Sequence, residues 1–170
     1  MKAIIGLADR LNHWVFNTIA ILFGLVTLLT IYQVFARFIL HSPLVWSEEV
    51  VRYSMIWIVL LGTSVALRKG LLVSVEIVLH IVPRKIKKMM EVLIVLLNVI
   101  FLFILIRYGF ILLELTNGQK IGALDLPVSV IYYAIPVAGI LGILNALLVL
   151  VEILTKKEKE EDKIDGSALI

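Results

Sequence analysis

Cysteine is absent from this chain of 170 residues, and charged residues are scarce, at 17% of the total. Without cysteine the chain forms no disulfide, no thiolate metal site and no cysteine nucleophile. The sequence also lacks a Walker loop, a GxGxxG fingerprint, an HExxH motif and a recognisable Ser/His/Asp set. The formal net charge of +3 is too small to indicate nucleic-acid binding. These absences predict a protein that is not an enzyme, carries no cofactor and binds no nucleic acid.

Apolar residues, in contrast, are in excess. They make up 61% of the chain, and the mean hydropathy is +1.06. A soluble domain typically has about 45–50% apolar and about 25% charged residues. A soluble protein of this size could not bury so much apolar surface, so the composition predicts an integral membrane protein in contact with membrane lipids.

Four apolar runs are long enough to cross a bilayer as helices. Residues 11–36 and 126–151 contain no charged residue, and residues 50–67 and 92–113 contain one arginine each. The runs do not alternate as the strands of a membrane barrel do, and the first is too long for a signal peptide. We therefore predict an all-α fold with a single four-helix transmembrane domain over residues 1–155. The predicted spans are about 14–40, 45–67, 89–115 and 127–153.

A fifth apolar run, between the second and third spans, is too short to cross. On a helix at residues 70–82, Glu76 and His80 fall with Lys69 and Arg84 on one narrow face, and most other positions are apolar. This pattern predicts an amphipathic helix lying in the membrane interface. The alternative is that the segment prolongs the second span as a tilted helix.

Basic residues predict the orientation. Twelve of them fall on one side of a four-span topology, whereas the other side has Lys120 in a loop and three arginines near helix ends. Because cytoplasmic loops carry the excess of lysine and arginine, both termini are predicted to be cytoplasmic. Residues 156–170 form a charged tail there, in which we expect the last helix to end and fray. The twelve are Lys2, Arg10, Arg68, Lys69, Arg84, Lys85, Lys87, Lys88, Lys156, Lys157, Lys159 and Lys163.

Six ionisable residues gather at the opposite, outer end of the predicted bundle, and their charges cancel. Either they pair with one another and extend to headgroups, or some of them face a partner protein or line an ion path. Glu48 and Arg52 have the i, i+4 spacing of a helical ion pair. The middle of the membrane offers no carboxylate, lysine or histidine, which argues against a through-membrane path. The six are Arg37, Glu48, Glu49, Arg52, Arg107 and Glu114.

Small residues recur every four positions in the fourth span, at Ala134, Ala138, Gly142 and Ala146. Such spacing lets another helix approach closely in lipid. Two readings stay open: packing within the bundle, or a docking face for another membrane subunit. Pro136, within this stretch, is predicted to kink the helix.

The motif residues of the first two spans resemble those of a known family. An arginine, Arg37, ends the first helix, W-S-E-E-x-x-R follows at Trp46, Glu48, Glu49 and Arg52, and Gly62 and Arg68 lie deeper in the second helix. This pattern, within this topology, is similar to the small membrane subunit of tripartite ATP-independent periplasmic (TRAP) transporters.

The resemblance implies a bacterial inner-membrane protein that acts as a non-catalytic scaffold. Its partners would be a large many-span subunit, which carries substrate and sodium, and a periplasmic substrate-binding protein. The substrate would be an organic acid, a carboxylate such as a C4-dicarboxylate or sialic acid. The alternative is a self-sufficient four-helix membrane protein, a small exporter or a redox anchor. An exporter of this kind would need a carboxylate embedded in the membrane, and the first and fourth spans of this chain have none. A redox anchor would need two histidines facing each other around a haem, and no pair among His13, His41 and His80 could meet in this way.

Overall fold

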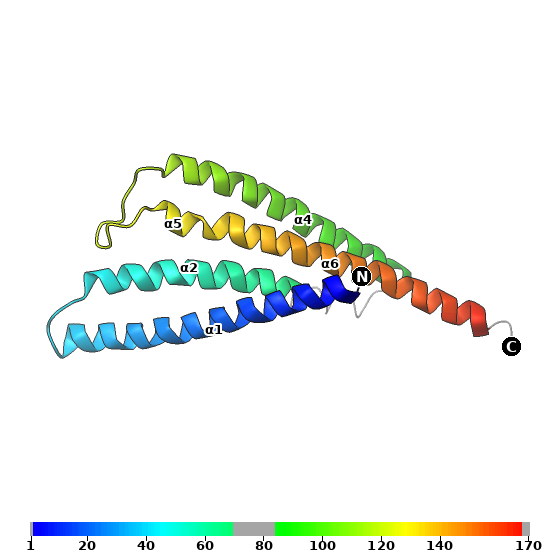
Figure 1. The fold of residues 1–170 in the computed structure, drawn as a ribbon, viewed down its shortest axis with the longest axis horizontal. Helices are drawn as coiled ribbons and strands as arrows, with labels where there is room; N and C mark the ends of the chain where they lie inside the picture. Colours follow the sequence, from blue (N-terminus) through cyan, green and yellow to red (C-terminus); the bar gives the residue numbers. More distant parts are fainter. Residues whose placement is uncertain (1, 70–83, 168–170) are drawn as a thin grey trace.

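The computed structural model describes residues 2–69 and 84–167 (Figure 1). In these ranges the chain is helical, and strand pairing is limited to one isolated bridge between Lys120 and Pro127. The all-α, four-span prediction is confirmed, whereas the predicted interfacial helix at 70–82 lies outside the described residues. The helices are α1 (Lys2–Phe38), α2 (Val45–Arg68), α4 (Arg84–Leu115), α5 (Ser129–Tyr132) and α6 (Ala134–Ser167). The stretches long and apolar enough to cross a membrane are Ile5–Phe38, Val45–Arg68, Met89–Leu115 and Ser129–Thr155.

Two helices extend beyond the predicted membrane spans. α1 begins at Lys2 rather than near residue 14, and α6 continues past the predicted span to Ser167, within the charged tail in which the last helix was expected to end. The predicted limits came from where charged residues begin, but a charged side chain such as that of Asp9 does not interrupt backbone hydrogen bonding. Charge thus indicates the depth at which a helix leaves lipid, and not the residue at which it ends.

The helices end where the backbone requires it. After α1, His41 has a left-handed φ of 51° and precedes Pro43 by two residues. After α4, Gly118 has φ 85°, a conformation that glycine adopts without strain. The break between α5 and α6 falls at Tyr133, because Pro136 has no N–H to offer the carbonyl four residues earlier. The interruption lies close to the kink predicted at Pro136.

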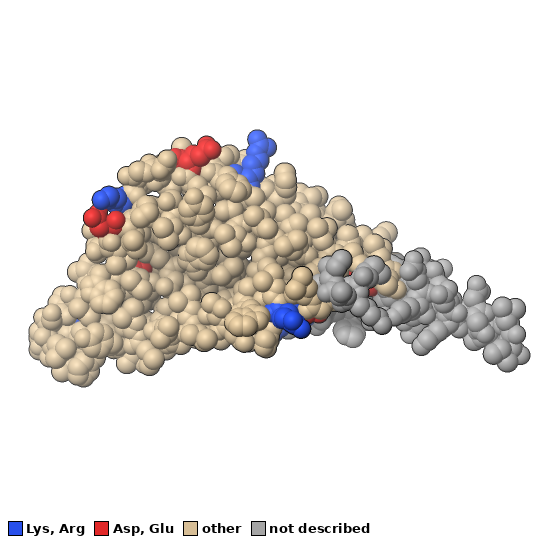
Figure 2. All heavy atoms as spheres, viewed as in Figure 1, with Lys and Arg blue, Asp and Glu red and all other residues tan. Residues whose placement is uncertain are grey.

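The long helices form an open layer and not a closed bundle. α1 packs on α2, α2 on α6, and α6 on α4 (Figure 1). The α1–α2 and α4–α6 pairs lie close together at the end near the N-terminus, here called the junction end. They separate toward the loops 39–44 and 116–128, here called the loop end. Large apolar side chains are exposed along all four helices, and few charges interrupt the face in Figure 2. This surface suits contact with lipid or with another membrane protein.

The four small residues of the fourth span lie inside this layer. Ala134, Ala138 and Ala146 are at most 5% exposed, and Gly142 is buried against Leu102 of α4. The small size of Gly142 lets α4 approach α6 closely, which is favourable for helix packing in lipid. Of the two readings left open, packing within the chain is the one that these contacts support, and little of this face remains accessible to another subunit.

Adding a methyl group at Gly139 is expected to loosen α4 from α6. A Cβ there would lie 2.5 Å from Cγ1 of Ile106, so the G139A variant should lose about 1–3 kcal/mol of unfolding free energy through overpacking. Unfolding of the purified protein in mixed micelles measures the loss. G24A is the matched control, because no atom lies within 4 Å of its added methyl group. Equal stability of the two variants would contradict the close α4–α6 packing.

Candidate functional site

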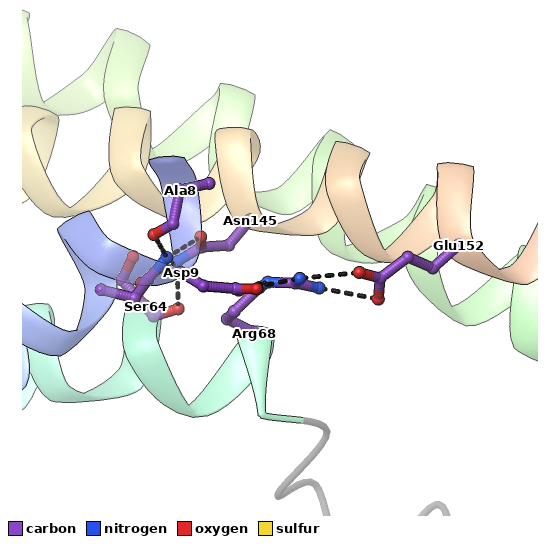
Figure 3. Close-up of polar contacts among 7 residues, drawn as sticks. Ala8, Asp9, Ser64, Arg68, Asn145 and Glu152 are labelled. Atoms are coloured by element: carbon purple, nitrogen blue, oxygen red, sulfur yellow. Dashed lines mark hydrogen bonds and ion pairs between the residues drawn. The ribbon is translucent and has the colours of Figure 1, made fainter. Parts of the chain in front are cut away.

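Two buried asparagines join helices at the junction end. The side-chain amides of Asn12 (α1) and Asn145 (α6) exchange hydrogen bonds: each Nδ2 donates to the other's Oδ1, at 2.7 and 2.8 Å. Asn145 also donates to the carbonyl oxygen of Ser64 in α2 at 2.8 Å, and Asn12 donates to that of Ala8 (Figure 3). Both asparagines are at most 5% exposed. Three helices are thus joined by one hydrogen-bonded group, where an unpaired amide would be costly.

One turn beyond Ser64, Arg68 connects the same three helices through charge. Its guanidinium donates through Nη1 and Nη2 to the two carboxylate oxygens of Glu152 (α6), at 2.8 and 2.7 Å. Nε donates to Oδ1 of Asp9 (α1) at 2.9 Å, and Nη2 lies at the same distance from that oxygen (Figure 3). The arginine side chain is 9% exposed, whereas those of Asp9 and Glu152 are 53% and 42% exposed. A planar guanidinium suits two carboxylates at once, which an ammonium group does not.

We call these six residues the polar junction: Asp9, Asn12, Ser64, Arg68, Asn145 and Glu152. Sequence reasoning named Arg68, but only as a motif residue and as one of the basic residues on the cytoplasmic side. It did not bring Asp9, Asn12, Asn145 and Glu152 together at one site. A signal was present, because Glu152 directly follows the charge-free run 126–151. The junction can hold helices together, and its geometry presents no nucleophile beside a base.

Other polar groups at intermediate depth are satisfied locally. Thr27, Thr30, Thr63 and Asn98 each donate to the carbonyl four residues earlier in their own helix. The Ser47 hydroxyl donates to Gln33, which joins α1 to α2 near the loop end. Within the described ranges no group of three or more His, Asp or Glu side chains is placed to hold a metal ion. The spans therefore contain helix-fastening contacts and, among the residues described, no continuous row of ionisable groups.

The six outer charges do lie toward the loop end, but they do not pair as one reading predicted. Among the described residues, no ion pair joins any two of them, and the Glu48–Arg52 pair does not form. Their side chains are exposed except for Glu49, which is partly buried. Exposed side chains at this level are hydrated, so an ion pair would gain little.

Glu49 instead binds the backbone of the loop between α4 and α5. Both of its carboxylate oxygens accept from the N–H of Ala123, at 3.3 and 3.2 Å. A salt bridge of 2.9 Å between Lys120 and Asp125 closes the same loop. α2 thereby fixes a loop that is distant in the sequence.

The remaining motif residues make few contacts. Trp46 is 45% exposed, and nothing lies within 4 Å of a Cβ placed on Gly62. The Arg37 guanidinium lies 6.0 Å from the ring centroid of its neighbour Phe38. These side chains are on the surface of the described chain.

Comparison with known proteins shows the family of this chain. Residues 26–156 match the family described as tripartite ATP-independent periplasmic transporters, DctQ component. The chain belongs to this family, the small membrane subunits of TRAP transporters. It is therefore a multi-pass membrane protein of a transport system. The matched residues include the motif around Trp46 and four members of the polar junction, whereas Asp9 and Asn12 precede them.

Two curated proteins are similar over part of the chain. The sialic acid TRAP transporter permease protein SiaT of Haemophilus influenzae (strain 86-028NP) is 33% identical over 102 residues, which cover 59% of this chain and 16% of that protein. The C4-dicarboxylate TRAP transporter small permease protein DctQ of Vibrio cholerae serotype O1 is 28% identical over 71 residues, which cover 42% of this chain and 31% of that protein. The aligned stretches thus span less than a third of either relative.

For this DctQ-family chain, the role of Glu49 can be tested by hydrogen exchange. In E49Q the amide loses its charged acceptor, so the Ala123 N–H should exchange about tenfold faster or more, since a hydrogen bond to a charged group contributes about 1.5–3 kcal/mol. E48Q is the control, because Glu48 is exposed and makes no described hydrogen bond. Unchanged exchange at Ala123 in E49Q would show that another group fixes the loop.

Proposed function

We propose that this chain is a non-catalytic scaffold of a TRAP transporter, against which a large sodium-coupled subunit moves during uptake of an organic acid. A periplasmic binding protein delivers the acid. The complex lies in the bacterial inner membrane, with both termini and the charged tail 156–170 of this chain in the cytoplasm. No nucleotide is hydrolysed, and the chain holds no cofactor.

The observation that carries this proposal is that polar side chains of the spans bind other parts of the same chain. Those at the polar junction fasten α1, α2 and α6 to one another, and others, such as Thr27 and Asn98, bond within their own helices. A carrier needs polar groups that face a substrate or an ion at mid-depth. A layer that is fastened at one end and apolar on its surfaces serves better as an immobile element.

The relatives support the need for a larger partner and the class of substrate. In the Haemophilus protein the similar stretch is 16% of a much longer chain, so most of that permease lies outside it. The relatives' names assign sialic acid to one of them and C4-dicarboxylates to the other. Both are acids that carry a carboxylate, and we extend this class, without choosing between its members, to the present transporter.

Reconstitution tests the scaffold role. This chain is to be co-expressed with the many-span protein encoded beside it, and the pair purified through a tag on this chain. We expect a much larger membrane protein to co-purify, and uptake into proteoliposomes to require both chains, the binding protein and a sodium gradient. Robust uptake by this chain alone would overturn the scaffold role in favour of a self-sufficient exporter.

The unpaired outer charges suggest a second role at the loop end. Arg52 and Glu48 are exposed and make no ion pair with each other, so they are free to present charge to the arriving binding protein. In R52A and E48A the membrane complex should assemble as usual, while the concentration of binding protein needed for half-maximal uptake rises. Loss of the assembled complex would instead show that these residues brace the helices.

A further inference from the structure

A hollow opens beside the polar junction, and its lining is mixed in charge. Three helices line it: α1 contributes Asp9, Asn12 and His13, the end of α2 contributes Arg68 and the adjoining Lys69, and α6 contributes Glu152. The Arg68 side chain is only 9% exposed, whereas the two carboxylates beside it are roughly half exposed. The hollow therefore has a fixed cationic group held between two accessible acidic groups.

The charges of this hollow do not cancel locally. Arg68 is shared by Asp9 and Glu152, so this trio keeps one net negative charge. Arg68 binds Asp9 through one oxygen only, Oδ1, and Oδ2 remains available as an acceptor. Lys69, on the rim, carries one positive charge, and the described residues offer it no carboxylate at ion-pair distance. A ligand that complements both the negative trio and Lys69 has one positive group and one negative group.

The depth of the hollow indicates where such a ligand comes from. Arg68 is the last residue of its apolar span, and Asp9 and Glu152 lie within four residues of the ends of theirs. This is the level at which an apolar span meets the headgroups of the bilayer. The Lys69 ammonium lies 4.2 Å from the ring centroid of Phe16, an exposed apolar side chain of α1. A lipid with its headgroup in the hollow has apolar helix surface beside it for its acyl chains.

We propose that this hollow binds the headgroup of a zwitterionic phospholipid with a primary ammonium, of the phosphatidylethanolamine type. The ammonium donates to Asp9 and Glu152, and the phosphate accepts from Lys69 and from His13. A quaternary ammonium has no N–H to donate, and an anionic headgroup would meet the net negative trio, so both bind less well.

Competition between lipids tests this site. The full chain is placed in nanodiscs that contain phosphatidylethanolamine and phosphatidylcholine with identical acyl chains in equal amounts, and native mass spectrometry counts the lipids retained after gentle release. We expect phosphatidylethanolamine to be retained about tenfold over phosphatidylcholine, a difference of about 1.4 kcal/mol. K69Q removes a phosphate contact that both lipids share, so it should lower the retention of both. The preference should fall to about twofold or less in D9A, which removes a carboxylate that accepts from the ammonium. It should be unchanged in K120Q, which alters a lysine at the loop end.

Equal retention of the two lipids, or a preference maintained in D9A, would overturn the proposal. Stronger retention of phosphatidylglycerol would show an anion site instead. Soluble O-phosphoethanolamine is expected to displace little lipid, because it lacks acyl chains. Displacement at micromolar concentration would assign the site to a water-borne zwitterion and overturn the lipid assignment. Circular dichroism of D9A, which changes a side chain that is 53% exposed, verifies that the variant is folded.

Discussion

Replacing Arg68 by alanine is expected to lower the unfolding free energy by about 2–3 kcal/mol and to separate α1 and α6 from the end of α2. The change leaves Asp9 and Glu152 facing each other without a cation between them. Removing one partner of a fully buried ion pair costs about 3–5 kcal/mol. The two carboxylates here are roughly half exposed and recover some hydration, which brings the expected cost down.

Unfolding of R68A in mixed micelles measures this loss, and R68K separates charge from shape. Lysine restores a positive charge but cannot donate two parallel hydrogen bonds to Glu152 and a further one to Asp9, so R68K should recover less than half of the lost stability. R107Q is the control, since Arg107 is an exposed arginine of the loop end. If R68A and R107Q were equally stable, the junction would not hold the helices together.

Replacing Asn145 by leucine is expected to cost about 1–3 kcal/mol, although leucine is favourable in lipid. The substitution removes the donor to the Ser64 carbonyl and leaves Oδ1 of Asn12 without its partner. N12L should cost a similar amount, and the double variant about 1 kcal/mol less than the sum, because both substitutions break the same pair.

The matched control for this pair is N98L. The Asn98 amide donates only to the Ile94 carbonyl within α4, so its loss separates no helices and should be neutral or slightly stabilising. Strict additivity of N12L and N145L would show that the two amides do not depend on each other.

The positions of the helices could be predicted from the sequence, because a long apolar run that does not alternate crosses a bilayer as a helix. The motif around Trp46 also indicated the family, because its residues are close together along the chain. The start of α1 was not predictable from charge, since Asp9 is a helical residue whose carboxylate is paired with Arg68.

The polar junction was beyond the reach of sequence patterns for a related reason. Asn12 and Asn145 are 133 residues apart, and nothing in the local sequence of either indicates the other. Which helices are neighbours in the layer decides this pairing, and the hydropathy of the sequence does not show which helices are neighbours. The same limit applies at Glu49, which looked like a partner for an arginine and binds a backbone N–H of a distant loop.

Because the helices are joined at the junction end, a small rotation there produces a larger displacement at the loop end. From Asn12 to the end of α1 at Phe38 is about 39 Å at 1.5 Å per residue. A rotation of about 5° at the junction would displace the far end of α1 by about 3 Å, roughly the donor–acceptor distance of a hydrogen bond. The polar junction thus acts as a pivot, and a small change in the angle of α1 there shifts the position of its far end at the loop end.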